Sequence, residues 1–188
     1  MRLNLPMVLR ASHIYRWQIV DTVRDQSIAE HMYNVWAISY ELFGALTDGL
    51  GIEELLAVNR RALSDHALTH DLEEVVTGDV PSPMKSALRG TYEFKKVEDE
   101  AKAQMGDGFP GPALKGTLAE AVVKLADLID AYRFLLRYGV ECQHKAAVVV
   151  ELRDKVYKVS KEILSGKFRI NGPHPAFTEL VEELMSPR

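Results

Sequence analysis

The chain has 188 residues, of which 47% are hydrophobic and 27% charged, and a net charge of −4, so we expect one soluble globular domain spanning residues 1–188. The acidic balance, with no basic stretch interleaved with aromatic residues, argues against a nucleic-acid polymer as a partner. A single cysteine, Cys142, excludes an internal disulfide, and the lack of a secretion signal and of an apolar run of roughly 20 residues predicts a cytoplasmic protein with no membrane span.

Helical periodicity predicts an all-α protein. Ser27 and Glu30 have the spacing of a capping box, and apolar residues then recur at helical intervals. Similar patterns follow along the chain, and no alternating pattern typical of a strand is present. We therefore expect a compact bundle of about six or seven helices. The expected helices are 27–46, 52–74, 84–104, 118–138, 146–164 and 175–184, with a turn at 78–83 and a loop at 106–112.

His70 and Asp71 stand side by side in the run LTHDLEEVVTGDVPSP, where the second helix is expected to end. An adjacent imidazole and carboxylate can both reach one divalent cation. Glu74 follows at helical spacing, so a helix that continues through this run would place it on the same face. Asp79 comes next, in a turn with two prolines. The segment therefore predicts a metal site with further carboxylates beside it.

Two other helices carry polar residues at positions that would otherwise face the core. His31 lies in the first turn after Ser27, and Asp127 lies between apolar neighbours in KLADLIDAY. A carboxylate on an apolar face is costly to bury unless it is paired. With His70 and Asp71 they would form a site of two nitrogen and two oxygen donors. Such a site suits manganese, cobalt, iron or zinc better than magnesium, and it leaves positions open for water and substrate.

Each residue also has an ordinary explanation when it is taken alone. His31 could be a polar residue at the start of a helix, and Asp127 could pair with Lys124 one turn before it. His66 is the first of two histidines four residues apart, but Ala67 stands where the metalloprotease motif HExxH requires glutamate, which excludes that motif. The ordered set across three segments is what favours a metal site.

The order and spacing of four blocks resemble one enzyme family. The blocks are RW at 16–17, AEH at 29–31, HDLEEVVTGDVPSP at 70–83 and KLAD at 124–127. They are similar to motifs of the HD-domain phosphohydrolases, and more narrowly of the YfbR-type 5'-deoxynucleotidases and their phage relatives, the dATP triphosphohydrolases. The resemblance implies an all-helical HD-domain fold, a metal-dependent phosphohydrolase, a small deoxynucleotide substrate and a homo-oligomer, a dimer or larger.

The resemblance also implies a role for each matching residue. The metal ligands, which we expect to hold zinc, cobalt or manganese, correspond to His31, His70, Asp71 and Asp127. Glu74 corresponds to the residue that handles the proton of the attacking water, and Asp79 to a second active-site carboxylate. Arg16 corresponds to the residue that orients the phosphate, and Trp17 to the one that packs against the sugar and base.

Smaller features favour the phage subfamily. Lys85, Lys124 and Arg16 would supply three cations, a suitable number for a triphosphate, although Lys85 could instead begin a solvated helix. Ile19 and Pro83 resemble residues that enclose adenine in the phage enzymes. We therefore predict that metal-activated water attacks the α-phosphorus of dATP, yielding deoxyadenosine and triphosphate. A second divalent ion such as magnesium would accompany the triphosphate.

Two alternatives remain open. The same site could release phosphate from deoxynucleoside 5'-monophosphates. The chain could also be a non-catalytic helical domain that binds a nucleotide, which the complete set of candidate ligands and the presence of Glu74 disfavour. If the gene belongs to a phage, we expect the protein to act in the host cytoplasm.

Overall fold

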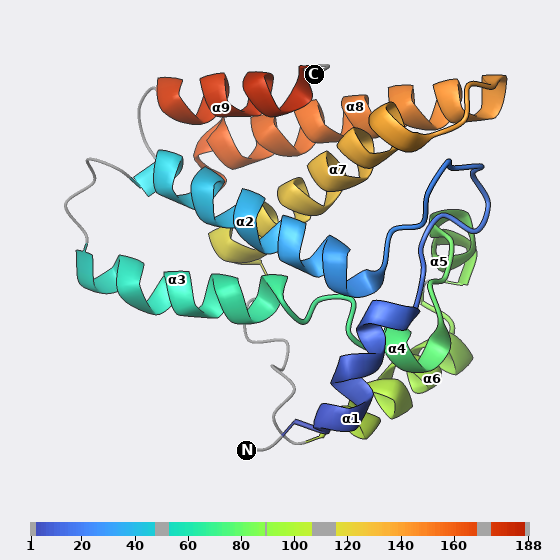
Figure 1. Ribbon diagram of the computed structural model, residues 1–188. Coiled ribbons are helices and arrows are strands. Elements are labelled where there is room, and N and C mark those ends of the chain that lie inside the picture. Colours follow the sequence, from blue (N-terminus) through green and yellow to red (C-terminus); the bar gives the residue numbers. More distant parts are fainter. Residues whose placement is uncertain (1–2, 48–52, 89, 107–115, 169–173, 187–188) are drawn as a thin grey trace.

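The computed structural model describes residues 3–47, 53–88, 90–106, 116–168 and 174–186. Over these ranges the chain forms nine α-helices, and its only extended pairing is two isolated bridges (Figure 1). The all-α prediction is confirmed. No helix in this part of the chain is long and apolar enough to cross a membrane.

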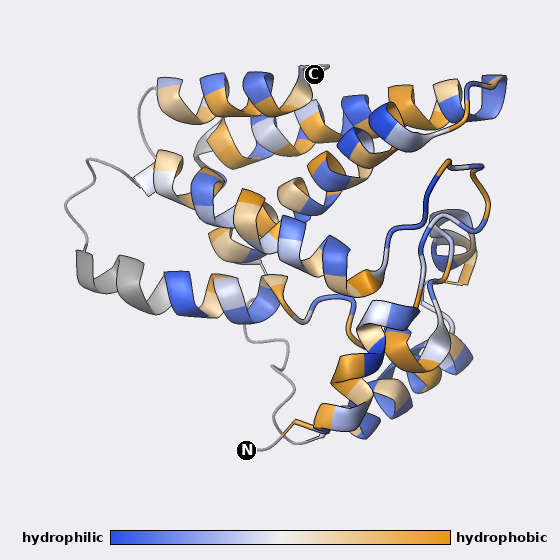
Figure 2. Cartoon of the chain, in the orientation of Figure 1, coloured by the Kyte–Doolittle hydropathy of each residue, from blue (hydrophilic) through white to orange (hydrophobic). Residues whose placement is uncertain are grey.

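Helices α2 (Ile28–Thr47) and α7 (Leu118–Tyr138) pack along each other at the centre of the fold. α8 (Gln143–Glu162) and α9 (Pro175–Met185) lie above this pair in Figure 1, and α3 (Glu53–Ala67) lies below it. Figure 2 shows hydrophobic and hydrophilic positions alternating around the helices. The long helices α2, α7, α8 and α9 are amphipathic in this way, and each buries one face in the core.

Both central helices begin with a side-chain cap. Ser27 Oγ accepts a hydrogen bond from the backbone N–H of Glu30 at 3.1 Å, and Thr117 Oγ1 accepts one from Glu120 at 3.3 Å. These hydroxyls satisfy N–H groups that have no partner in the first helical turn. The helices that the sequence predicts for α2, α7 and α9 agree with the structure within one residue at each end.

The second expected helix, 52–74, ends earlier than predicted. α3 stops at Ala67, and a run of turns separates it from the short helix α4 (Glu74–Thr77). The prediction that Glu74 shares a helix face with His70 and Asp71 is therefore wrong, because those two residues lie in the turns.

Side-chain hydrogen bonds to the backbone explain the early end of α3. Thr69 Oγ1 donates to the carbonyl of Asp65, and His70 Nδ1 donates to the carbonyl of Ala67 at 2.8 Å. Such bonds compete with the backbone bonds of a further helical turn. As a result, the His70 and Asp71 side chains project from a compact turn.

The third expected helix, 84–104, is divided into α5 (Ser82–Leu88) and α6 (Tyr92–Gln104). Gly90 between them has a φ of +90°, a conformation that L side chains rarely adopt. Thr91 then caps the start of α6. The chain can therefore change direction at Gly90, which separates the two helices.

The remaining differences concern helix ends and a loop. α8 begins at Gln143, before the expected start of the helix at 146–164, and it continues at Ile163–Lys167 as a π-helical turn, η2. Beyond Gly106, the loop expected at 106–112 lies outside the described residues.

The N-terminal segment packs beside the start of α2. After α1 (Leu5–Val8) and the 3-10 helix η1 (Leu9–His13), residues 14–27 form a loop. The backbone N–H of Arg16 donates to the carbonyl of Gln26 at 2.9 Å and joins the two arms of this loop. Further backbone hydrogen bonds attach the loop to the end of α7. The loop therefore has a fixed position above the first turn of α2.

Candidate metal site

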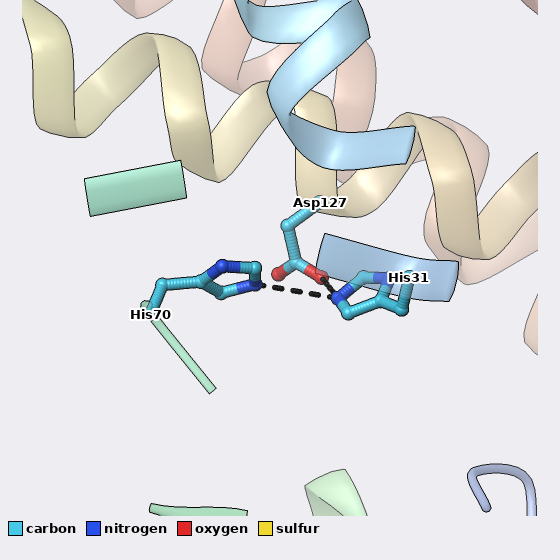
Figure 3. Close-up of side chains that lie close together, drawn as sticks. All are labelled: His31, His70 and Asp127. Atoms are coloured by element: carbon cyan, nitrogen blue, oxygen red, sulfur yellow. Dashed lines mark hydrogen bonds and ion pairs between the residues drawn. The ribbon is translucent and has the colours of Figure 1, made fainter. Parts of the chain in front are cut away.

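Four side chains from three parts of the fold converge at one point. His31 comes from the first turn of α2, Asp127 from α7, and His70 and Asp71 from the turns after α3. Figure 3 shows His31, His70 and Asp127 pointing toward one another. His31 is fully buried, and the other three residues are half-buried. The structure thus brings together all four residues expected as ligands.

The Nε2 atom of His31 lies at the centre of this group. It is 3.3 Å from His70 Nε2, 3.4 Å from Asp127 Oδ1 and 3.5 Å from Asp71 Oδ2. His70 Nε2 is also 3.5 Å from Asp71 Oδ2. Donor atoms bound to one zinc-sized ion lie about 3.0–3.6 Å apart, given the usual metal–ligand lengths. The spacing of His31, His70 and Asp127 therefore fits a single divalent ion, and the carboxylate of Asp71 lies beside both imidazoles.

The hydrogen bonds of the two imidazoles also fit a cation. His70 Nδ1 faces the carbonyl of Ala67 at 2.8 Å, and His31 Nδ1 faces the carboxylate of Asp130 at 2.7 Å. A carbonyl and a carboxylate only accept, so both Nδ1 atoms carry the ring hydrogen. The two Nε2 atoms then direct their lone pairs toward each other across 3.3 Å. A proton or a metal ion between them removes the repulsion.

Asp130 is a residue of the site that the sequence analysis missed. It is 4% exposed and lies one turn after Asp127 on α7. Its carboxylate accepts hydrogen bonds from Gln26 Nε2 at 2.8 Å, Asn34 Nδ2 at 2.9 Å and His31 Nδ1 at 2.7 Å. A carboxylate behind a metal-binding histidine fixes the ring and raises its basicity. The sequence feature that could have identified Asp130 is a second aspartate on the same apolar face, in LADLIDAY.

Carboxylates dominate the electrostatics of the site. Burial and the Arg16 guanidinium lower the pKa of His31, but hydrogen bonds to three carboxylates outweigh both effects and raise this pKa to about 10. Burial favours a higher pKa for Asp127, but the bond and charge of His31 lower it to about 2. The pKa of Asp71 is likewise held well below its usual range, against burial, by His70 and His31. The group therefore attracts a cation, either a proton on His31 or a metal ion.

Arg16 lies at the edge of the cluster. Its Nη2 atom is 3.9 Å from Asp127 Oδ1, and its Nη1 atom is 3.9 Å from Asp130 Oδ2. Burial lowers the pKa of Arg16, but the surrounding carboxylates outweigh burial and raise it. Nη1 is buried and has no hydrogen-bond partner among the described residues. An unpaired N–H of this kind is costly unless an acceptor such as a phosphate oxygen binds to it.

Glu74 and Lys85 form an ion pair beside the cluster. Glu74 is 2% exposed, its Oε1 pairs with Lys85 Nζ, and its Oε2 has no hydrogen-bond partner in the described part of the chain. Burial and the charge of Asp71 raise the pKa of Glu74 to about 8 against the opposing effect of Lys85, and the half-buried Asp79 adds to the rise. A carboxyl group with this pKa can exchange protons near neutral pH.

The other expected substrate residues are more accessible. Lys124 is exposed on α7, Pro83 is exposed at the start of α5, and Ile19 is 50% exposed in the loop 14–27. Lys85 is half-buried and bound to Glu74, an arrangement that the sequence patterns do not indicate. The sequence left two roles open for Lys85, binding to phosphate and contact with solvent. In the structure the same side chain is instead paired with Glu74.

Trp17 is held in a defined position next to Arg16. Its ring stacks in parallel on Phe134 with the centroids 5.9 Å apart, and its Nε1 donates to Gln26 Oε1 at 2.9 Å. The Arg16 guanidinium lies 5.4 Å from the centre of the ring. Trp17 has a φ of +71°, which is strained for a residue with a bulky side chain. Several contacts therefore maintain a conformation that the backbone alone disfavours.

A comparison with protein families decides the class of this chain. The family described as 5'-deoxynucleotidase YfbR-like matches residues 5–138. The chain belongs to the YfbR-like family. The matched region contains every candidate residue of the site, and the family resemblance predicted from the sequence is confirmed.

Relatives of this YfbR-like protein include two kinds of enzyme. A dATP triphosphohydrolase of Salmonella phage PMBT28 is 33% identical over 132 residues, which are 70% of this chain and 66% of the relative. The dATP triphosphohydrolase of cyanophage S-2L is 38% identical over 136 residues, 70% and 69% of the two chains. A 5'-deoxynucleotidase of Pectobacterium atrosepticum is 30% identical over 135 residues, 65% and 66% of the two chains. The YfbR-like chain thus aligns with about two thirds of the length of these relatives.

Solved structures confirm the HD-domain helical fold. The HD phosphohydrolase DatZ of cyanophage S-2L, bound to dA and one catalytic zinc ion, matches with a TM-score of 0.58 and 26% identity, over 98% of this chain and 95% of that chain. An HD-domain phosphohydrolase of Listeria innocua matches with a TM-score of 0.55 and 20% identity, over 95% and 97% of the two chains.

Proposed function

We propose that this YfbR-like protein hydrolyses dATP to deoxyadenosine and triphosphate, with a divalent metal ion held by His31, His70, Asp71 and Asp127. The observation that carries the proposal is the spacing of 3.3–3.5 Å between His31 Nε2 and the other three donor atoms. Two nitrogen and two oxygen donors suit zinc, cobalt or manganese. Zinc has further support, because DatZ holds a catalytic zinc ion.

In the proposed reaction, the oxygen of water forms a bond to the α-phosphorus, and the bond from this phosphorus to the 5'-oxygen breaks. The 5'-oxygen leaves with a proton as deoxyadenosine. A divalent ion in a site of this kind lowers the pKa of water and polarises a phosphoryl oxygen. Glu74 would take up the proton that water loses, since its Oε2 has no hydrogen-bond partner within the described ranges and its pKa is about 8. Asp79 would help to keep that pKa near neutral.

Arg16 and Trp17 would bind the substrate on the side of the loop 14–27. The Nη1 atom of Arg16, which has no hydrogen-bond partner among the described residues, is suited to an oxygen of the α-phosphate, where a guanidinium offsets negative charge. The Trp17 ring, held between Phe134 and Gln26, would pack against the deoxyribose and leave no room for a 2'-hydroxyl. Ile19 would then border the adenine.

The proposed function and its alternative differ in the number of phosphate groups that the site must bind. The β- and γ-phosphates would bind near Lys85 and Lys124, with Pro83 beside the base and a second ion such as magnesium. However, Lys85 is paired with Glu74, which leaves fewer free cations for a triphosphate. This pair is the observation that favours the alternative, release of phosphate from deoxynucleoside 5'-monophosphates, an activity that the name of the Pectobacterium relative also gives.

Chromatography of the products from dATP and dAMP separates these functions. The protein is supplied with zinc, cobalt or manganese and incubated with each nucleotide. Deoxyadenosine and intact triphosphate from dATP would support the proposal. Rapid cleavage of dAMP with dATP left intact would assign the alternative. If the metal binds and neither nucleotide is hydrolysed, the chain is a non-catalytic nucleotide-binding domain.

We also propose that the protein is a homo-oligomer. Tyr33 and Tyr40 lie on one face of α2 and are 60% and 40% exposed. Exposed aromatic side chains of this kind are enriched in subunit interfaces. Gel filtration with light scattering measures the mass directly, and a monomer across the accessible concentration range would contradict this part of the proposal.

A further inference from the structure

A chain of hydrogen bonds connects Trp17 with His31 through the buried side chain of Gln26. Trp17 Nε1 donates to Gln26 Oε1 at 2.9 Å, and Gln26 Nε2 donates to Asp130 Oδ2 at 2.8 Å. His31 Nδ1 binds the same oxygen of Asp130 at 2.7 Å. Gln26 has no exposed surface. The ring expected to contact the sugar is therefore linked to a candidate metal ligand by three consecutive bonds.

The chemistry of its neighbours fixes the orientation of the Gln26 amide. An indole N–H can only donate, so the amide oxygen must face Trp17. The carboxylate of Asp130 can only accept, so the amide nitrogen must face Asp130. A reversed amide would place donor against donor and acceptor against acceptor in a buried place, which is costly. Only a side chain with both a donor and an acceptor at this reach can make the connection.

Gln26 also holds the same segment through its backbone. Its carbonyl accepts the hydrogen bond from the N–H of Arg16 at 2.9 Å. Trp17, which follows Arg16, has the strained φ of +71°. A conformation of this kind persists only where surrounding contacts maintain it. The backbone of Gln26 thus fixes the start of the Arg16–Trp17 pair, and its side chain fixes the indole.

We propose that Gln26 is a positioning residue that couples substrate selection at Trp17 to metal binding at His31. The inference rests on the proposed function, because it gives Trp17 the task of selecting deoxyribose. A shift of the indole changes the partner of the Gln26 amide, and Asp130 then loses one of the donors that orient it. The imidazole of His31 depends on that carboxylate for its own orientation.

Asn34 provides a matched control. Its Nδ2 atom donates to Asp130 Oδ1 at 2.9 Å, so it orients the same carboxylate as Gln26 does. Asn34 lies on α2, and its side chain has no hydrogen bond to Trp17 among the described residues. Loss of the Asn34 amide should therefore disturb the metal side of the chain alone, whereas loss of the Gln26 amide should disturb both sides.

The variants Gln26→Met and Asn34→Leu test this difference, because each keeps a similar shape without an amide. Zinc affinity is measured by competition with a chromophoric chelator, and substrate selection as the ratio of kcat/KM for dATP to that for ATP. Both variants should lower zinc affinity by about tenfold or more. Only Gln26→Met should also lower the dATP-to-ATP ratio. An unchanged ratio in Gln26→Met, or an equal fall in both variants, would overturn the coupling.

A double-mutant cycle with Trp17→Phe tests the indole bond itself. Phenylalanine can still stack on Phe134 but cannot donate to Gln26. If the bond carries the effect, the variants Trp17→Phe, Gln26→Met and their combination should lower the dATP-to-ATP ratio to a similar extent. Changes that multiply in the combined variant would show that the two residues act independently, and would contradict the proposal.

A measurement without substrate separates this inference from the proposed function. The chain has two tryptophans, so Trp36→Phe leaves Trp17 as the one fluorescent indole. Addition of zinc should change its emission, and Gln26→Met should abolish that change while circular dichroism shows an intact fold. If dATP is not hydrolysed but this response depends on Gln26, the proposed function fails and the coupling stands. If dATP is hydrolysed and Gln26→Met alters neither emission response nor zinc affinity, the coupling fails alone.

Discussion

The Nδ1 atom of His31 lies 2.7 Å from Oδ2 of Asp130, and both side chains are buried. Since Nδ1 donates to the carboxylate, the lone pair of Nε2 points to the centre of the donor group, 3.4 Å from Asp127 Oδ1. The bond selects one tautomer and one ring orientation of His31. Metal binding should therefore depend on a residue that is not itself a ligand.

The variant Asp130→Leu should lower zinc affinity by about 10- to 100-fold, because it removes the acceptor that orients His31. Competition with a chelator measures the change. Asp154→Asn, a neutralisation at an exposed position of α8, is the control for a general effect of charge. Equal zinc affinity of Asp130→Leu and the unmodified protein would mean that the ring is oriented by other contacts.

The variant Glu74→Gln should retain the metal and lose turnover by about 100-fold or more, since an amide keeps the shape but cannot accept the proton of water. The two readouts are bound zinc, by elemental analysis, and the initial rate with dATP. Loss of zinc from Glu74→Gln would instead assign Glu74 as a metal ligand.

The fold could be predicted well because its long helices have clear apolar periodicity and caps. The helices expected for α2, α7 and α9 match the structure closely. The end of α3 could not be predicted, because it depends on hydrogen bonds from Thr69 and His70 to the backbone rather than on apolar spacing. Local side-chain competition of this kind leaves no periodic signal in the sequence.

The site was predictable only in part for a related reason. The sequence singles out His31, His70, Asp71 and Asp127 as candidate ligands because they form an ordered set of donor types. Residues that support them have no such signature. Asp130 looks like any other polar residue until α7 is seen to bury it, and Gln26 is 104 positions from the carboxylate that it binds.

The variant Lys85→Met distinguishes two roles for this lysine. In the structure it pairs with Glu74, so its removal leaves a buried carboxyl group without its cation and should raise the pKa of Glu74 further. Activity should then fall for triphosphate and monophosphate substrates alike, by about tenfold or more. Initial rates with dATP and dAMP measure this.

The variant Lys124→Met is the comparison for Lys85→Met. Lys124 is exposed on α7 and three residues from Asp127, so its removal should raise KM for dATP and leave KM for dAMP unchanged. A loss confined to dATP in both variants would show that Lys85 binds the phosphate tail and that its pairing with Glu74 is secondary.

The variant Trp17→Ala should raise activity on ATP relative to dATP, because it opens space for a 2'-hydroxyl beside the sugar. The strained φ of +71° should also become easier to relieve without the stacking on Phe134. The measurement is the ratio of kcat/KM values for the two nucleotides. An unchanged ratio would move the discrimination to another residue, with Asp79 as the next candidate.

Zinc affinity should increase with pH because zinc and a proton compete for Nε2 of His31. Three carboxylates raise the pKa of His31 to about 10 in the metal-free chain, against burial and Arg16. Metal binding must displace that proton from Nε2, while Nδ1 keeps its hydrogen and continues to donate it to Asp130. Asp127, with a pKa of about 2, is already ionised near neutral pH and adds no dependence there.

Below the raised pKa of His31, each increase of one pH unit lowers the ratio of protonated to neutral His31 by up to tenfold. Zinc should therefore bind more tightly as the pH rises from about 6 to about 9, and its affinity should level off near pH 10. Isothermal titration calorimetry in buffers of different ionisation enthalpy counts the protons released. About one proton per zinc from this site is expected at pH 8. An affinity independent of pH, with no proton released, would show that His31 is neutral before the metal binds.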